Sequence, residues 1–207
     1  SKDNLEYLWV QLDQNMRAPD SKTPLARPES LQNTAFNGPI TFTKTNLQKP
    51  EDFGFKIEAV KNENGSPLSH MINRTMMRIN LPTPLASGGT FKFSIQWNYL
   101  INNSVEDGGR SGFESFPDGN NNYTIAQFFP RLAVYDNVEG WQNMQFWGRS
   151  EWALEFGDYD VKLTVPADHI VEATGELQNP KKVLSRKQRK RFEQAKKSFK
   201  DPVFIVT

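Results

Sequence analysis

The two histidines of this chain are the most conspicuous candidates for metal chemistry, and their spacing does not make a zinc site. His70 and His169 lie far apart in the sequence, and neither falls in an HExxH pattern, which would place two ligands on one face of a helix. The chain has no cysteine, which excludes a thiolate metal site and a disulfide framework. We therefore predict no metal ligand within this sequence and interpret both histidines as surface or core residues.

Neither a nucleophilic serine nor a pair of carboxylates has the spacing that catalysis would need. Residues 109–112 read Gly-Arg-Ser-Gly, which does not match the G-x-S-x-G turn of serine hydrolases. Glu155, Asp158 and Asp160 could bind calcium or act as acid and base, but no EF-hand-type spacing accompanies them. Solvated strand edges and turns are the favoured interpretation of these carboxylates. The sequence thus predicts no catalytic residue.

The positive charge of the chain is concentrated near its C-terminal end. The formal net charge is +1, from 25 basic and 24 acidic residues, yet residues 181–200 hold ten of the basic residues and a single acidic one, Glu193. The other residues, 15 basic and 23 acidic, carry a net charge of −8. This asymmetry suits either docking within the protein or contact with an anionic partner. Because the segment lacks interleaved stacking aromatics, we predict no nucleic-acid partner.

Gln127 is the polar residue whose setting most suggests contact with a ligand. Tyr123, Ile125 and Gln127 alternate as in a strand, and Pro130 cannot donate to a sheet ladder, so this strand should end or turn there. A polar side chain at a strand end is well placed to meet a ligand or a neighbouring domain. A solvated glutamine without a role is the alternative. Gln127 belongs to residues 126–141, which combine a proline turn with a row of aromatics.

Alternating apolar residues predict the strands that would position this segment. The clearest pattern runs over residues 91–99, where large apolar residues alternate with polar ones. Similar alternation is found at residues 8–12, 53–57, 77–81, 152–165 and 170–177. Within 152–165 the phase changes at Gly157, which predicts a bulge or tight bend. About eight or nine strands without intervening helices predict an all-β fold, an antiparallel β-sandwich.

Turn and helix signals separate these strands. The pair Asn64-Gly65 predicts a tight hairpin turn. Residues 13–39 contain several prolines and no periodicity, which predicts a long surface loop, and residues 102–122, rich in Gly, Asp, Ser and Asn, predict a mobile one. A capping box that begins at Ser185 predicts one short C-terminal helix, basic in character, over residues 185–199.

The length and composition favour a single globular domain over residues 1–207. Hydrophobic residues make up 37% of the chain and aromatic residues 12%, which is enough apolar surface for a substantial core. No apolar run approaches the roughly 18 residues needed to cross a bilayer, so we predict no membrane span. The abrupt start beside a strand and the apolar end at residues 202–206 lead us to expect a piece of a longer protein.

Short phrases spread along the chain carry a family resemblance. They are residues 8–14 (LWVQLDQ), 127–136 (QFFPRLAVYD), 140–141 (GW), 155–166 (EFGDYDVKLTVP), 173–177 (ATGEL) and the tail from 177 to 206. In this order they resemble the N-terminal domain of zinc metalloaminopeptidases of the aminopeptidase N and leukotriene-hydrolase type, most closely the bacterial members. The resemblance covers most of the chain except the proline-rich loop after Asp13.

The resemblance implies a saddle-shaped antiparallel β domain that packs on a thermolysin-like catalytic domain of the same chain. In that family the catalytic domain binds zinc through HExxH and a downstream glutamate, and the enzyme removes N-terminal residues from peptides. The zinc would therefore belong to a catalytic domain that residues 1–207 do not contain, and this chain alone would be inactive. Analogy with bacterial relatives also implies a periplasmic, cell-surface or secreted location.

The resemblance further assigns a role to one polar side chain of this domain. In the family, a Gln or Glu at the end of a strand that leads into a proline turn reaches the active site and helps bind the substrate's amino group. Gln127 is the position that best matches, although the spacing from it to Pro130 is shorter than in animal members. Asn121 or Asn122 could hold the role instead.

Two other functions stay open at the level of the sequence. A free-standing β-sandwich could bind peptide or glycan through the aromatics Trp141, Phe146 and Trp147. An adhesion or structural module could use its basic helix to dock on anionic partners. An HExxH motif in the parent gene beyond residue 207 would decide for the aminopeptidase.

Overall fold

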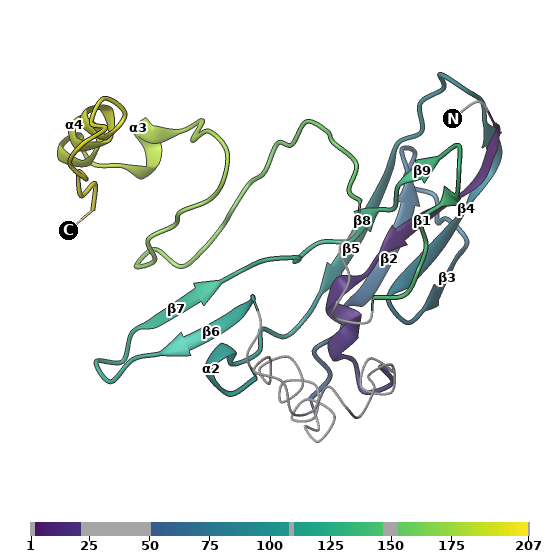
Figure 1. Cartoon of the computed structure of the whole chain (residues 1–207), viewed down its shortest axis with the longest axis horizontal. Helices are drawn as coiled ribbons and strands as arrows, with labels where there is room; N and C mark the ends of the chain where they lie inside the picture. The colour runs from purple at the N-terminus through teal and green to yellow at the C-terminus, as the bar shows by residue number, and fades with distance from the viewer. Residues whose placement is uncertain (1–2, 22–50, 108–109, 147–152, 207) are drawn as a thin grey trace. The chain divides into compact units, whose positions relative to one another are not determined.

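The computed structural model describes residues 3–21, 51–107, 110–146 and 153–206 (Figure 1). Contacts within the chain divide it into two compact units, Ser1–Asp158 and Tyr159–Thr207. Within the described residues, the strands belong to the first unit, and the second unit contains two helices. The single sandwich domain expected over residues 1–207 stays a prediction.

A four-stranded antiparallel sheet in the order β3-β4-β1-β8 forms the centre of the first unit. β1 lies in the interior of this sheet, where Val10 pairs with Met77 of β4 on one side and with Leu132 of β8 on the other. The first strand is therefore a direct neighbour of the segment that follows Pro130 (Figure 1). The bounds of the four strands are Leu5–Gln11 (β1), His70–Asn73 (β3), Met76–Leu85 (β4) and Arg131–Leu132 (β8).

A second antiparallel sheet pairs β2 (Lys56–Asn62) with β5 (Phe93–Asn98). The chain leaves β2 through the predicted Asn-Gly turn. Oδ1 of Asn62 accepts hydrogen bonds from the backbone N–H groups of Asn64 and Ser66, at 3.0 and 2.9 Å, and Gly65 has a φ of +80°. Glycine adopts this left-handed conformation at little cost, so the predicted turn is confirmed.

Side chains from both sheets meet in one apolar core. The main sheet contributes Val10, Met77 and Ile79, and full burial of a side chain of this size contributes roughly 1.5–3 kcal/mol. The rest of the buried cluster is Leu12, Phe55, Val60 and Leu68, and the residues packed against it are Ile57, Phe91, Phe93, Ile95, Trp97 and Tyr99. The described residues are mostly β, with small antiparallel sheets and few helices, which confirms the predicted fold class in part; the β-sandwich stays a prediction.

Residues 102–122, predicted to be a mobile loop, form regular structure instead. A short helix, α2 (Ser104–Asp107), precedes a hairpin of β6 (Gly112–Ser115) and β7 (Asn121–Thr124). The turn residues that suggested a loop lie at the hairpin tip, where the N–H of Gly119 donates to the carbonyl of Phe116. A second small hairpin pairs β9 (Tyr135–Asp136) with β10 (Gly140–Trp141).

The predicted surface loop over residues 13–39 begins as a buried turn of helix. The 3₁₀ helix η1 (Asp13–Arg17) follows β1 directly, and its polar residues Asp13, Gln14, Asn15 and Arg17 are buried. Polar side chains tolerate burial when hydrogen bonds satisfy them, and those bonds come from residues far along the chain. Residues 22–39 of the predicted loop lie outside the described residues.

The strands predicted at 152–165 and 170–177 are absent from the described residues 153–206. Side chains along both segments are exposed, and Phe156 is fully so. A bulge requires two paired strands, and Gly157 lies in none, so the predicted bulge is absent. Alternation specifies two faces of a strand but not its partner, and no strand of the described residues pairs with these segments.

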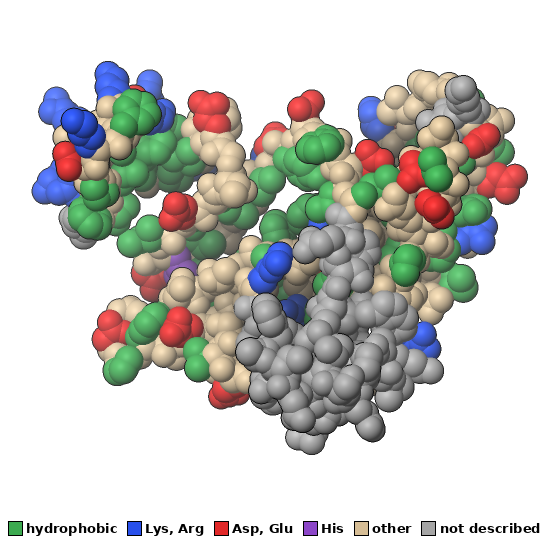
Figure 2. Space-filling model, in the orientation of Figure 1, with side chains coloured by type: hydrophobic (Ala, Val, Ile, Leu, Met, Phe, Trp, Pro, Cys, Tyr) green, Lys and Arg blue, Asp and Glu red, His purple; other side chains and the backbone are tan. Residues whose placement is uncertain are grey.

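The second unit contains α3 (Pro180–Val183) and α4 (Arg186–Ala195). The capping box is present: Oγ of Ser185 accepts from the N–H of Gln188, and Oε1 of Gln188 accepts from the N–H of Ser185. The helix predicted over 185–199 is confirmed, but it ends four residues earlier, at Ala195. Figure 2 shows the Lys and Arg side chains gathered over these helices. None of the helices in the described ranges is long and apolar enough to span a membrane.

Candidate functional site

Gln127 lies in a turn beyond the end of β7, so the prediction that it ends a strand was wrong. β7 ends at Thr124, and β8 begins only at Arg131. The backbone of Gln127 is left-handed, with a φ of 52°. That conformation costs a residue other than glycine about 1–2 kcal/mol, and it persists only where surrounding groups hold it.

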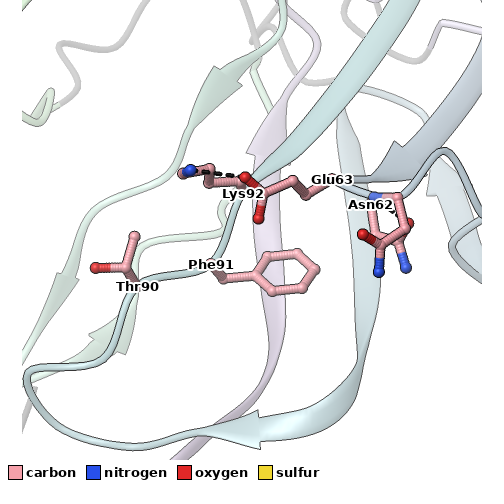
Figure 3. Close-up of a pocket in the computed structure, with 6 residues that line it drawn as sticks. Asn62, Glu63, Thr90, Phe91 and Lys92 are labelled. Carbon is pink, nitrogen blue, oxygen red and sulfur yellow. Dashed lines mark hydrogen bonds and ion pairs between the residues drawn. The ribbon is translucent and has the colours of Figure 1, made fainter.

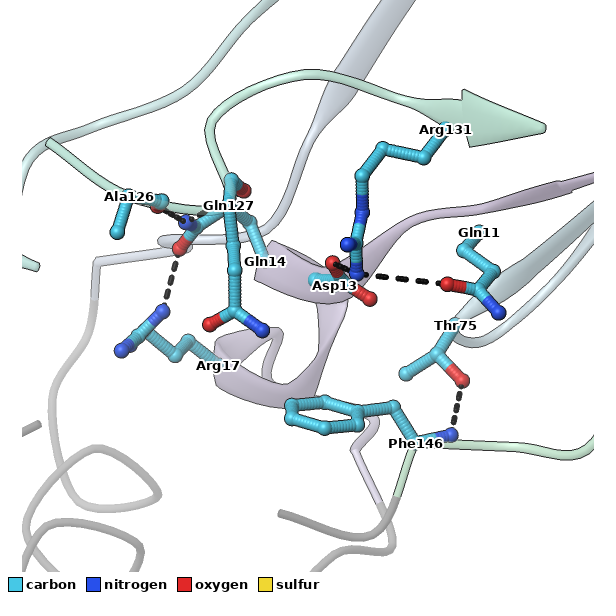
Figure 4. A network of polar contacts seen from close by, with 9 residues as sticks. All are labelled: Gln11, Asp13, Gln14, Arg17, Thr75, Ala126, Gln127, Arg131 and Phe146. Atoms are coloured by element: carbon cyan, nitrogen blue, oxygen red, sulfur yellow. Dashed lines mark hydrogen bonds and ion pairs between the residues drawn. The ribbon is translucent and has the colours of Figure 1, made fainter. Parts of the chain in front are cut away.

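Side chains from two other elements hold the carbonyl groups of this turn, and Figure 4 shows one of them, Gln14. Nε2 of Gln14 in η1 donates to the carbonyl oxygens of Ala126 and Gln127, at 3.2 and 3.0 Å. Nε1 of Trp97 in β5 donates to the carbonyl of Phe128 at 3.0 Å. Three consecutive carbonyls are therefore bound by side chains, and the left-handed residue is the middle one of the three.

The side chain of Gln14 can make these contacts in one orientation only. Nη1 of Arg17 donates to Oε1 of Gln14, and a guanidinium has donors but no acceptor. The oxygen of the Gln14 amide must therefore face Arg17, which turns its NH₂ group towards the carbonyls of Ala126 and Gln127 (Figure 4). Gln14 is 1% exposed, so water does not compete for these bonds.

Arg17 is itself buried and charged. Burial lowers the pKa of its guanidinium to about 10, against the opposing electrostatic effects of Tyr99, Asp107 and Asp13. Arg17 therefore stays protonated at neutral pH and keeps donating to Gln14. Asp107, at the end of α2, is 1% exposed, so the carboxylate that interacts with Arg17 lies in the interior as well.

An ion pair fixes the other end of the turn. The guanidinium of Arg131, the first residue of β8, donates to the carboxylate of Asp13 and, at 3.4 Å, to Oε1 of Gln11. Asp13 is 3% exposed, and burial raises its pKa while the charge of Arg131 acts in the opposite direction. The segment from Ala126 to Arg131 is thus bound to β1 and η1 at both ends.

The side chain of Gln127 is half-buried, and its amide group is not occupied by a hydrogen bond within the described residues. Figure 4 shows it projecting from the turn on the side where η1 and Phe146 lie. Among the described residues, no hydrogen bond involves its amide group, whereas its own carbonyl is held by Gln14. The turn therefore presents an amide oxygen and an amide NH₂ from a backbone that is rigidly supported.

The alternative residues Asn121 and Asn122 lie elsewhere. Both are exposed residues of β7, where they pair with Ser115 and Glu114 of β6. Oδ1 of Asn121 already accepts from Oγ of Ser115 at 2.6 Å. The structure brings neither asparagine to the Gln14 and Arg17 network, whereas the backbone of Gln127 is part of it.

The other residues weighed for chemistry are not brought together. His70 contacts the carbonyl of Leu68, and His169 contacts its neighbour Asp168. Within the described ranges, no three His, Cys, Asp or Glu side chains form a group that could hold a metal ion. The hydroxyl of Ser111 donates to the carbonyl of Thr124 and accepts from the N–H of Ala126, so it supports the turn.

An open hollow of about 400 Å³ lies beside the turn after β2 (Figure 3). Glu63 and Lys92, on its rim, form an ion pair with each other at 2.6 Å. The side-chain oxygen of Asn62 is occupied by two backbone N–H groups of its own turn. These polar groups satisfy one another, so the hollow offers a ligand little beyond Thr90 and the face of Phe91.

Two of the three aromatics proposed to bind peptide or glycan, Trp141 and Phe146, lie in the described residues, and both are partly buried. The ring of Trp141 packs edge-on against Tyr135, with centroids 5.2 Å apart. Phe146 is tied to the main sheet through its backbone N–H, which donates to Oγ1 of Thr75 at 2.7 Å (Figure 4). Trp147 lies outside the described residues.

The sequence predicted a surface loop at Gln14 and Arg17 and assigned neither residue a role. One signal could have found them. Residues 13–18 contain no Gly or Pro and directly follow a buried strand, so the chain was free to continue as one turn of helix before Pro19.

No known protein family, curated protein or solved structure matches this chain.

Proposed function

We propose that this chain is the non-catalytic N-terminal β domain of a zinc metalloaminopeptidase that hydrolyses N-terminal residues from peptides. In this role it walls the active-site cleft and offers Gln127 to the substrate's free amine. The observation that supports the proposal best is the left-handed turn at Gln127, which is held by buried side chains while its own amide stays uncommitted. Backbone conformations that cost this much free energy cluster at active sites and ligand-binding turns.

The zinc of the proposed enzyme would be bound by HExxH and a glutamate of the catalytic domain, where it would activate the attacking water. The residues described here contribute binding alone. The partners of the domain are then the catalytic domain of the same chain and the peptide substrate.

The chemistry of Gln127 is recognition of a cation by a neutral amide. Its Oε1 accepts a hydrogen bond from the substrate ammonium, a charge-assisted bond worth about 1.5–3 kcal/mol. A held turn loses little conformational entropy on binding, so more of that energy is available to the substrate.

The family resemblance implies that the enzyme lies in the periplasm, at the cell surface or outside the cell.

Two experiments test the function. The parent gene should encode HExxH and a downstream glutamate beyond residue 207, and an uninterrupted reading frame without them contradicts the proposal. In the full-length enzyme, Gln127→Ala should raise KM or lower kcat for peptides with a free amine. Gln194→Ala, at an exposed position of α4, is the matched control. Unchanged kinetics across several peptides would rule out the role of Gln127.

A further inference from the structure

We propose that Gln14 and Arg17 are positioning residues for recognition of the substrate amine, and that they act by setting the backbone of Gln127. This inference rests on the proposed function. Neither residue needs to touch substrate. Their effect passes through the carbonyl of Gln127, which Gln14 binds at 3.0 Å.

The first step of the argument is the conformation that has to be held. Without a partner, Gln127 would relax from a φ of 52° to the right-handed or extended region, and its side chain would leave its present direction. The bonds from Gln14 to Ala126 and Gln127 place both carbonyls on the side of η1. They therefore select the left-handed turn.

The second step is the polarity of the Gln14 amide. Arg17 can only donate, so its bond to Oε1 of Gln14 keeps that oxygen on the side of Arg17 and the NH₂ group towards the two carbonyls. The order of dependence is thus Arg17, Gln14 and the turn at Gln127.

The decisive variant is Gln14→Glu in the full-length enzyme. A glutamate keeps the shape of glutamine and forms an ion pair with Arg17, but its carboxylate has no N–H to donate. The carbonyls of Ala126 and Gln127 then face a repulsive group. Arg17→Lys is the second variant, because it keeps the positive charge but changes the donor geometry that orients Gln14.

The readout isolates the ammonium contact. Inhibition constants are measured for leucine amide and for 4-methylpentanamide, which lacks only the amine. The inhibition constant of 4-methylpentanamide divided by that of leucine amide reports how much the amine contributes to binding. Gln127→Ala should lower this ratio about tenfold or more, the loss expected for one charge-assisted bond. Gln14→Glu should lower it about threefold or more, as expected for coupled neighbours.

A double-mutant cycle separates positioning from general destabilisation. If Gln14 acts through Gln127, then Gln14→Glu has no further effect on the ratio in the Gln127→Ala background. Equal effects of Gln14→Glu in both backgrounds would overturn the inference, as would an unchanged ratio in Gln14→Glu and Arg17→Lys. If Gln127→Ala alone leaves the ratio unchanged, the proposed function fails, and the inference falls with it.

A readout independent of activity is amide hydrogen exchange in the same full-length proteins. Gln14→Glu should speed exchange in the peptide that spans residues 125–132, while the peptide that spans β2 keeps its protection. Unchanged exchange at residues 125–132 would show that Gln14 does not hold the turn, which overturns the inference.

Discussion

The side-chain NH₂ of Gln14 and the backbone carbonyl of Gln127 are joined by a 3.0 Å hydrogen bond between the first helical turn of the chain and the turn that precedes β8. The donor is buried, and the acceptor belongs to a residue in the left-handed region. This contact connects the packing of the first unit with the backbone conformation that directs the side chain of Gln127.

Gln14→Leu should destabilise the first unit by about 2–4 kcal/mol. The substitution keeps a side chain of similar size but leaves the carbonyls of Ala126 and Gln127 and one N–H of Arg17 without this partner. Urea unfolding followed by tryptophan fluorescence measures the change. Gln194→Leu, on the exposed side of α4, should stay within about 0.5 kcal/mol of the wild type. Equal stabilities for the two variants would contradict this prediction.

Asp13 should make the domain less stable as pH rises. Because burial raises its folded-state pKa above 3.8, the folded state binds more protons than the unfolded state between pH 3.8 and that folded pKa. The unfolding free energy of the wild type minus that of Asp13→Asn should therefore fall as pH rises through this window. Urea titrations at several pH values measure it, and a difference that rises with pH would contradict the stated direction of the shift.

The pKa of the Asp136 carboxyl should lie below 3.8, whereas burial raises the pKa of Asp13 above that value. The pKa of Asp136 is lowered by hydrogen bonds from the N–H of Glu139, the side chain of Gln142 and the N–H of Val138. Its contribution to stability is thus present above 3.8 and is lost as pH falls through the folded pKa. A carbon-detected NMR titration of the carboxyl gives the value, and Gln142→Leu should move it upward. A pKa at or above 3.8 would contradict the hydrogen-bonded turn.

Ser185→Ala should weaken α4 by about 1 kcal/mol, because Oγ of Ser185 satisfies the N–H of Gln188 at the start of the helix. Amide exchange across residues 186–195 should speed up, and exchange in the first unit should not change. Lys187→Ala, within the same turn but outside the capping box, is the control. Equal protection in Ser185→Ala and the wild type would show that the cap does not support the helix.

The elements predicted correctly are those with local signatures. Period-2 alternation marks the strand around Trp97, the Asn-Gly pair marks the turn at Gly65, and Ser185 marks a helix start. Each of these depends on residues within a few positions of one another. The strands expected at 152–165 and 170–177 carry the same alternation, yet they have no partner within the described residues. Alternation alone does not supply one.

The candidate site was predictable only in part. Gln127 is marked by its place before Pro130, which predicts a change of direction. Its left-handed backbone carries no sequence signal, because glutamine is not a residue that favours φ > 0. For Gln14 and Arg17, the absence of Gly and Pro over residues 13–18 indicates at most a turn of helix. Their roles carry no sequence signal, because Gln14 bonds to residues far along the chain and Arg17 acts through Gln14.

The most direct test of the central claim is the pair of measurements on Gln127→Gly in the full-length enzyme. Glycine adopts a φ of 52° without the penalty of other residues, so the variant should be as stable as the wild type or about 1 kcal/mol more stable. With the amide removed, kcat/KM for leucine p-nitroanilide should nevertheless fall about tenfold or more. An unchanged kcat/KM at equal stability would contradict the claim that Gln127 binds the substrate amine.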